Sequence, residues 1–113
     1  MFRFVIAAFW LIPILSFGPV AAEGDYDAGK ALAKEWECTR CHGLTGNERS
    51  FDPPLVPMLA GQPEGYLVKT LNEYKTGARL DEHIWSKMTL RARALSAQDI
   101  EDVSAYFAAQ KRY

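Results

Sequence analysis

Two cysteines and a histidine lie within five consecutive residues, Cys38-Thr39-Arg40-Cys41-His42. This spacing is the attachment signature of c-type haem, in which two thiols form thioether bonds and the adjacent imidazole reaches the iron. One helical turn brings both sulfurs and the imidazole to the same side. The motif therefore predicts one covalently attached haem c, held by Cys38 and Cys41, with His42 as an iron ligand.

Three other interpretations of this motif compete with haem attachment. A disulfide or a thioredoxin-like redox pair is expected near a βαβ pattern, which the sequence does not show. A structural zinc site needs four ligands, but the chain has two cysteines and two histidines, and His83 is far from the motif. A chance match in a short chain is the third interpretation, and the flanking sequence argues against it.

Residues 1–22 have the pattern of a secretory signal peptide. Arg3 is the single charge, an apolar run follows it, and small residues end the segment. Val20 and Ala22 stand at the −3 and −1 positions of a cleavage site before Glu23. We therefore expect a cleavable signal at 1–22, a single haem-binding domain at 23–113, and export to the bacterial periplasm.

An uncleaved membrane anchor is the alternative for the same segment. A spanning helix needs about 20 consecutive apolar residues, and Pro13, Gly18 and Pro19 interrupt this run. After cleavage no other long apolar run remains, so we expect no stable membrane insertion. A formal net charge of −1 and the lack of a basic stripe also argue against nucleic-acid binding.

The mature chain predicts three to four helices and no sheet. We expect helices over about 25–36, 63–76 and 96–110, a breaker-rich loop over 43–57, and a less regular segment over 78–95. The apolar stripes expected to face inward are Ala28, Leu32 and Trp36; Tyr66, Leu67, Thr70, Leu71 and Tyr74; and Ile100, Val103 and Phe107. The fold class is therefore all-α, with the helices wrapped around one cofactor.

The second iron ligand decides between electron transfer and chemistry at an open iron. Met88, His83 and Met58 are the candidates in the mature chain, and an open position is the fourth possibility. Met88 is favoured because it lies eight residues before the Ser96 start of the last helix, where the chain can cross the haem. The residues alone leave all four possibilities open.

From about Asp25 to Gln110 the chain resembles class I cytochromes c, and in particular the bacterial c4 and c553 group. The likeness is carried by Cys38-Thr39-Arg40-Cys41-His42-Gly43, Pro57-Met58-Leu59-Ala60-Gly61-Gln62, Tyr66-Leu67, Gly77-Ala78-Arg79, Met88, Leu95-Ser96-Ala97-Gln98-Asp99-Ile100 and Ala105-Tyr106-Phe107. The resemblance implies a class I cytochrome c fold with His42 and Met88 as the axial iron ligands. It also implies a hydrogen bond from His42 to the carbonyl of Pro54, and a crossing of the first and last helices at Gly29.

The resemblance implies a periplasmic one-electron carrier rather than an enzyme. Its partners are expected to be redox proteins: a dehydrogenase or membrane complex as donor, and an oxidase or reductase as acceptor. Two alternatives stay open. The first alternative is that the chain is the haem subunit of a multi-protein dehydrogenase complex. The second, which is less favoured, is a sensor or enzyme with an open iron site.

Expression with its first 22 residues in a bacterial host tests the export signal. Because the small-residue end favours cleavage, we expect the purified protein to begin at Glu23, as measured by intact mass. A species that retains Met1 would contradict the predicted signal peptide.

Overall fold

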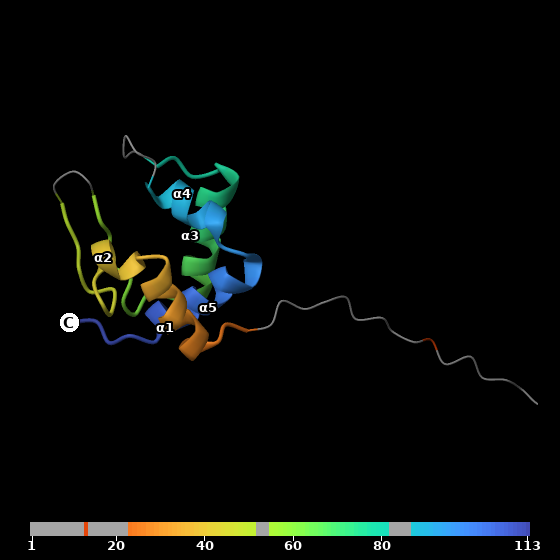
Figure 1. Ribbon diagram of the computed structural model, residues 1–113, viewed down its shortest axis with the longest axis horizontal. Coiled ribbons are helices and arrows are strands. Elements are labelled where there is room, and N and C mark those ends of the chain that lie inside the picture. The colour runs from red at the N-terminus through yellow and green to blue at the C-terminus, as the bar shows by residue number, and fades with distance from the viewer. Residues whose placement is uncertain (1–12, 14–22, 52–54, 82–86) are drawn as a thin grey trace, which may run out of the picture.

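The computed structural model describes Pro13 and residues 23–51, 55–81 and 87–113. This part of the chain forms five helices: α1 (Tyr26–Glu35), α2 (Cys38–His42), α3 (Glu64–Thr76), α4 (Lys87–Ala94) and α5 (Ala97–Ala108) (Figure 1). The pairing of extended segments in the described ranges is a single antiparallel bridge between Ser50 and Val56. The all-α prediction is confirmed. The rest of the predicted signal peptide, Pro54 and His83 lie outside the described residues.

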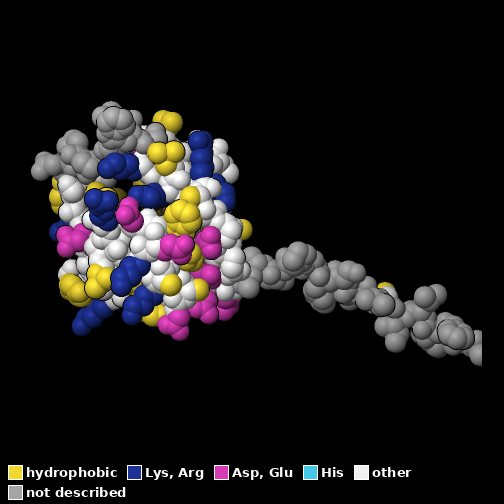
Figure 2. Space-filling model, viewed as in Figure 1, with side chains coloured by type: hydrophobic (Ala, Val, Ile, Leu, Met, Phe, Trp, Pro, Cys, Tyr) yellow, Lys and Arg dark blue, Asp and Glu magenta, His cyan; other side chains and the backbone are white. Residues whose placement is uncertain are grey.

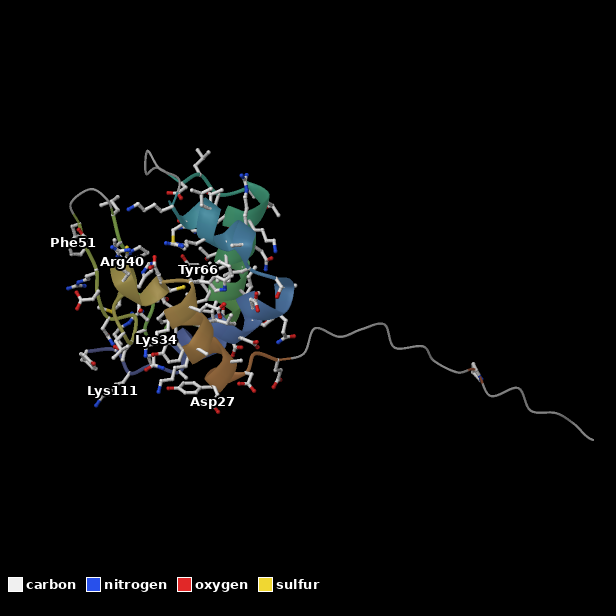
Figure 3. The ribbon with its side chains drawn as sticks, viewed as in Figure 1. Asp27, Lys34, Arg40, Phe51, Tyr66 and Lys111 are labelled. Carbon is white, nitrogen blue, oxygen red and sulfur yellow. The ribbon has the colours of Figure 1, made fainter. Side chains whose placement is uncertain are left out.

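The helix boundaries follow local capping chemistry. The Asp25 carboxylate accepts the Ala28 N–H at 2.8 Å and so caps α1, which carries Asp27 in its first turn and Lys34 in its last (Figure 3). The sequence Ser96-Ala97-Gln98-Asp99 has the spacing of a capping box, and it forms one at the start of α5, where Ser96 and Asp99 each accept the other's backbone N–H at 3.0 Å.

Helix α3 ends as predicted and begins one residue later than predicted. Gly77 takes the left-handed conformation, with φ 82°, just past the last helical residue. Pro63 was expected at the first helical position, but it is the N-cap with extended backbone, and Glu64 opens the helix.

Helix α4 replaces the irregular segment that the sequence predicted before Ser96. Its eight residues contain neither glycine nor proline, and Leu, Arg and Ala favour helix. The Asp81 carboxylate accepts the Thr89 N–H at 3.1 Å, which satisfies one of the amides at the helix start. Met88 is therefore presented from the first turn of a helix rather than from a loop.

The core lies where α1 crosses α5, with α3 packed on the other side of α5. Ile100, Val103, Tyr106 and Phe107 of α5 are buried, which confirms the predicted stripe. On α1 the buried residues are Gly29 and Ala33, whereas the predicted face of Ala28, Leu32 and Trp36 is only half-buried. The predicted face of α1 was wrong by one residue, because close contact with α5 favours its smallest side chains.

Gly29 allows α1 to approach the backbone of α5. A Cβ atom built on Gly29 would lie 1.9 Å from the carbonyl oxygen of Asp102 and 3.0 Å from the Cβ of Tyr106. The predicted crossing of the first and last helices at Gly29 is confirmed, and Tyr106 is the aromatic residue that packs there. The Tyr106 hydroxyl then donates to the carbonyl of Leu44 at 2.6 Å and ties α5 to the loop after the motif.

The segment after α2 turns back beneath it and is fixed by the end of the chain. The carbonyl of Gly46 accepts the N–H groups of Leu59 and Ala60 at 2.8 and 3.0 Å. Arg112 donates from Nε to the carbonyl of Ala60 at 2.9 Å, and Asn47 donates to the carbonyl of Lys111 at 2.9 Å. The predicted loop thus has a defined path beside the motif over its described residues.

Replacement of Gly29 by alanine should destabilise the protein. The added methyl group would collide with a backbone carbonyl that cannot move alone, so we expect a loss of about 1–3 kcal/mol in the free energy of unfolding. Gly65→Ala is the matched control, because nothing lies within 4 Å of a Cβ at that exposed position of α3. Urea unfolding of the haem-loaded protein by circular dichroism measures both, and equal midpoints would contradict the close approach.

Candidate haem site

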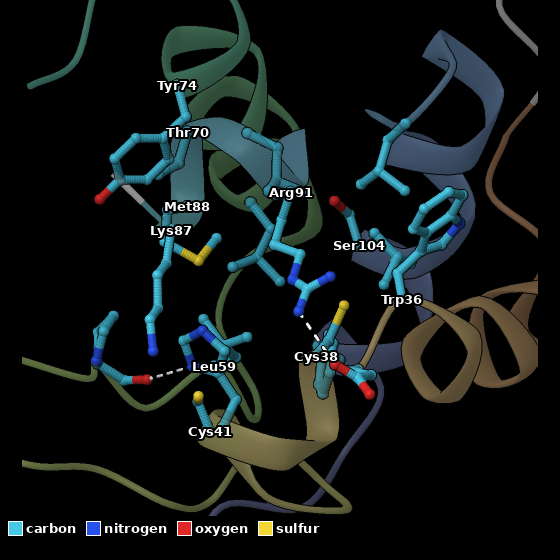
Figure 4. Close-up of a pocket in the computed structure, with 18 of the residues that line it drawn as sticks. Trp36, Cys38, Cys41, Leu59, Thr70, Tyr74, Lys87, Met88, Arg91 and Ser104 are labelled. Atoms are coloured by element: carbon cyan, nitrogen blue, oxygen red, sulfur yellow. Dashed lines mark hydrogen bonds and ion pairs between the residues drawn. The ribbon is translucent and has the colours of Figure 1, made fainter. Parts of the chain in front are cut away.

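A cavity of about 660 Å³ lies between the motif helix and the other helices. Its lining comes from α2, from the loop around Pro57, and from α3, α4 and α5. Figure 4 shows the side chains of Cys38, Cys41 and Met88 around it. The volume is within the usual range for sites that enclose an organic ligand.

Helix α2 presents the motif as the single turn that the sequence predicted. Cys38 and Cys41 both line the cavity, and each carries a free thiol. Burial raises the pKa of the Cys38 thiol, while its backbone hydrogen bond and the nearby Arg91 oppose that rise. Cys41 lies at the exposed edge. The two sulfurs are therefore available to one bound group.

His42 is buried, with 5% of its surface exposed, and its ring is held by one backbone bond. Nδ1 donates to the carbonyl of Pro57 at 3.0 Å. Burial lowers the pKa of His42 and the bond to Pro57 partly offsets that change. A neutral ring that donates from Nδ1 leaves Nε2 as the free basic nitrogen, which is the arrangement of a metal-bound histidine.

The predicted partner of His42 was wrong by three residues. Pro57, and not Pro54, supplies the carbonyl. The pairing of Val56 with Ser50 sets the register of the returning segment, and this register brings the next residue, Pro57, beneath the ring. The family pattern predicted a proline carbonyl but could not give the register of the turn.

Met88 reaches the same cavity from the opposite helix. It lies in the first turn of α4, and Figure 4 shows its sulfur turned toward the interior of the cavity. Met58 is half-buried and also lines the cavity, but it directly follows the Pro57 carbonyl that holds His42. The structure thus brings Cys38, Cys41, His42 and Met88 around one space. His83 lies outside the described residues.

The predicted inward stripe of α3 lines the cavity, and two of its members, Leu67 and Leu71, also pack in or against the hydrophobic core. Leu67 alone among its members is buried, and 47% of Tyr66 is exposed. All five predicted members line the cavity: Tyr66, Leu67, Thr70, Leu71 and Tyr74. The amphipathic pattern was correct, but the surface it matches belongs to the cavity.

Charged side chains at the cavity are mainly basic. Arg40, Arg79, Lys87 and Arg91 line it together with one carboxylate, Glu37. Figure 2 shows basic groups gathered around a hollow on this face of the domain, with an acidic group between them. A hydrogen bond to Tyr66 is the main cause of the raised pKa of Arg79, whose guanidinium lies 5.4 Å from the centre of the Tyr74 ring.

The cavity wall fits a large, mostly apolar group that also carries hydrogen-bonding atoms. Aliphatic and aromatic residues of α3 and α5 supply most of the wall. Ser104 of α5 is 1% exposed, and its hydroxyl has no hydrogen-bond partner within the described part of the chain. An unpaired buried hydroxyl costs about 1–3 kcal/mol, and a bound group with an acceptor at this wall would remove that cost. The donor set and the wall both fit haem.

Comparison with known proteins decides the family. The Cytochrome c family model matches residues 26–111. This chain belongs to the cytochrome c family. Cytochrome c4 of Stutzerimonas stutzeri is 41% identical over 99 residues, a match that covers 83% of this chain and 45% of that protein. Cytochrome c-554(548) of Halomonas halodenitrificans is 35% identical over 85 residues, which cover 75% of this chain and 98% of that protein.

The solved structures agree with the sequence matches. The crystal structure of reduced recombinant cytochrome c4 from Pseudomonas stutzeri matches with a TM-score of 0.64 and 38% identity, over 80% of this chain and 47% of that one. The chain spans less than half the length of the c4 relatives that it matches. It is a class I, c4-like cytochrome, and the predicted class I cytochrome c fold is confirmed.

Membership of the family also establishes the cofactor. The cytochrome binds haem c covalently through its Cys38-Thr39-Arg40-Cys41-His42 motif. The zinc and redox-dithiol interpretations of the two cysteines are therefore wrong. In the described part of the cytochrome, no helix is both long and apolar enough to cross a membrane.

Three residues at the site were missed by sequence reasoning. Ser104 sits among core residues of α5, and a small residue there gives no signal of a cavity wall. Glu37 and Arg91 were not singled out from the sequence, although one precedes Cys38 and the other lies one turn after Met88. Their positions in the sequence beside predicted site residues were the available signal.

Proposed function

We propose that this cytochrome is a periplasmic one-electron carrier in which His42 and Met88 are the two axial ligands of the haem iron. One observation carries the proposal. A neutral imidazole and a thioether line the same cavity from two different helices, with the two attachment cysteines beside them. The bound haem supplies a metal that changes oxidation state by one electron. The protein supplies an apolar cavity wall and the two ligands that close both faces of the iron.

The choice of Met88 over Met58 as the iron ligand is supported by the side of the cavity on which each residue lies. Met58 is joined by one peptide bond to Pro57, whose carbonyl holds His42, so it belongs to the histidine side of the cavity. Met88 comes from α4, which packs on α3. A methionine opposite the histidine gives a closed six-coordinate iron suited to electron transfer.

Periplasmic location is supported by the amino-terminal pattern and by the cofactor. Residues 1–22 end in small residues before Glu23, as a cleaved signal does. The mature cytochrome is then the domain from residue 23 to residue 113, with one haem.

A dehydrogenase is the proposed electron donor. One relative bears the name thiosulfate dehydrogenase electron acceptor, from Stutzerimonas stutzeri, and is 38% identical over 95 residues, which cover 41% of that protein. Whether the cytochrome meets its donor transiently or as a permanent subunit is decided by size-exclusion chromatography of native extract. We expect it to migrate as a free small protein, and stable co-migration with a dehydrogenase would favour the subunit alternative.

Replacement of Met88 by alanine should open the iron. We expect the oxidised Met88→Ala protein to lose the weak red absorption band of methionine-ligated ferric haem. Its reduction potential should fall, because a thioether ligand favours the reduced iron. Haem should stay attached, because both cysteines remain.

Met58→Ala is the matched control, since it removes the other methionine at the same cavity. It should keep the band and a potential close to that of the unmutated protein. Retention of the band in Met88→Ala together with its loss in Met58→Ala would reverse the assignment.

A further inference from the structure

Glu37 and Arg91 form an ion pair across the cavity. Nη2 of Arg91 lies 3.1 Å from Oε2 of Glu37, in both hydrogen-bond and ion-pair geometry. The dashed line in Figure 4 shows the Arg91 guanidinium reaching this carboxylate beside Cys38. Both residues line the cavity. Glu37 directly precedes the first attachment cysteine, and Arg91 lies one helical turn after Met88. The pair therefore joins the two chain segments that carry the proposed iron ligands.

The backbone of Glu37 points to a role for its side chain. Glu37 has φ 57° and is the one non-glycine residue with positive φ in the described part of the chain. It follows the C-cap of α1, where a left-handed residue is usually glycine, because a Cβ atom makes this conformation unfavourable. Gly77, just past the end of α3, shows that this chain uses glycine for the same left-handed conformation elsewhere. A glutamate in this strained conformation is explained when its carboxylate makes an interaction that glycine cannot make.

Helix α4 needs such a contact because its helix packing is one-sided. Among the described helices, α4 packs closely on α3, whereas the motif helix α2 packs closely on α1. Asp81 and the Lys75 ammonium also hold α4, at Thr89 and at the carbonyl of Leu95, but both come from the side of α3. Among the polar contacts of the described residues, the Arg91–Glu37 pair joins α4 to the segment that carries the motif.

We infer that the Glu37–Arg91 ion pair is a positioning contact that holds Met88 over the haem face opposite His42. This inference rests on the proposed ligation by Met88. Without the pair, α4 moves more freely away from the motif, and Met88 is displaced more readily by an external ligand. The residues do not touch the iron, and they act through the position of α4.

Arg40 provides an internal control for the charge of Glu37. It lies 3.5 Å from the same carboxylate, but it belongs to α2 itself, three residues after Glu37. The Arg40–Glu37 pair lies within one helical turn and does not connect the motif to α4. Removal of Arg40 therefore changes the charge at the cavity by one unit, as removal of Arg91 does, without releasing α4.

Imidazole titration of the oxidised, haem-loaded protein tests the inference. Imidazole competes with methionine for ferric haem, so its dissociation constant reports how firmly Met88 is held. An ion pair with half-exposed partners has a modest effect, and we expect imidazole to bind about two- to fivefold more tightly to Glu37→Gln and to Arg91→Gln. The double variant should match either single variant, because the same interaction is lost. Arg40→Gln should match the unmutated protein.

Two further measurements separate a positioning role from a structural one. Glu37→Gly relieves the backbone strain, so its unfolding midpoint should equal or exceed that of the unmutated protein, while imidazole still binds more tightly. Added salt screens the pair, so high ionic strength should bring the unmutated protein toward Glu37→Gln, whose own affinity should stay constant. Unchanged affinity in Glu37→Gln, or an equal gain in Arg40→Gln, overturns the inference.

The red methionine band of the unmutated oxidised protein distinguishes the two levels of the proposal. If the band is absent, ligation by Met88 fails, and the positioning role fails with it. If the band is present and the variants bind imidazole like the unmutated protein, only the positioning role fails.

Discussion

The close contact between Gly29 and the backbone of Asp102 places the haem motif. Helix α1 can lie against α5 only where a side chain is absent. Because α2 begins three residues after α1 ends, the crossing also sets where Cys38 stands relative to the α5 wall. Tyr106 packs at this crossing and also fixes the loop after the motif, because its hydroxyl donates to the carbonyl of Leu44. The position of the motif thus follows from a helix crossing that contains no cofactor ligand.

Helices α3 and α4 line one side of the haem cavity. In α3 a five-residue apolar and polar stripe lines the cavity, and only Leu67 is buried. In a domain this small, packing of helix on helix buries too little surface for stability. A covalently attached, largely apolar haem completes the core. This explains why helix α4, which packs on α3, depends on side-chain contacts such as Arg91–Glu37 for its place beside the motif.

The sequence predicted those features that depend on local chemistry. The motif turn, the Ser96–Asp99 capping box and the left-handed Gly77 were recoverable because each rests on a few adjacent residues. Features set by register or by long-range packing were not. The carbonyl of Pro57 replaced that of Pro54 because the bridge between Ser50 and Val56 sets the register of the returning segment. The buried face of α1 shifted to Gly29 and Ala33, because a periodic pattern cannot show how closely a partner helix approaches.

The same distinction applies to the site. Cys38, Cys41, His42 and Met88 were found from spacing and family resemblance, and they line one cavity in the structure. The surroundings of these residues were not found, because Ser104, Glu37 and Arg91 have no distinctive spacing and gain meaning only from what lies beside them. Irregularity was predicted for the segment that carries Met88. It is instead helical, since Asp81 caps it and its residues favour helix.

Closure of the iron by a methionine sulfur is the central claim, because it separates an electron carrier from an open-site haem protein. X-ray absorption at the iron edge of the oxidised, haem-loaded protein measures it directly. The cysteine sulfurs are bound to the porphyrin and not to iron, so a sulfur at bonding distance has to come from methionine. We expect one sulfur neighbour and five nitrogens. An iron with no sulfur neighbour, whether five-coordinate or completed by oxygen or a sixth nitrogen, would contradict the account.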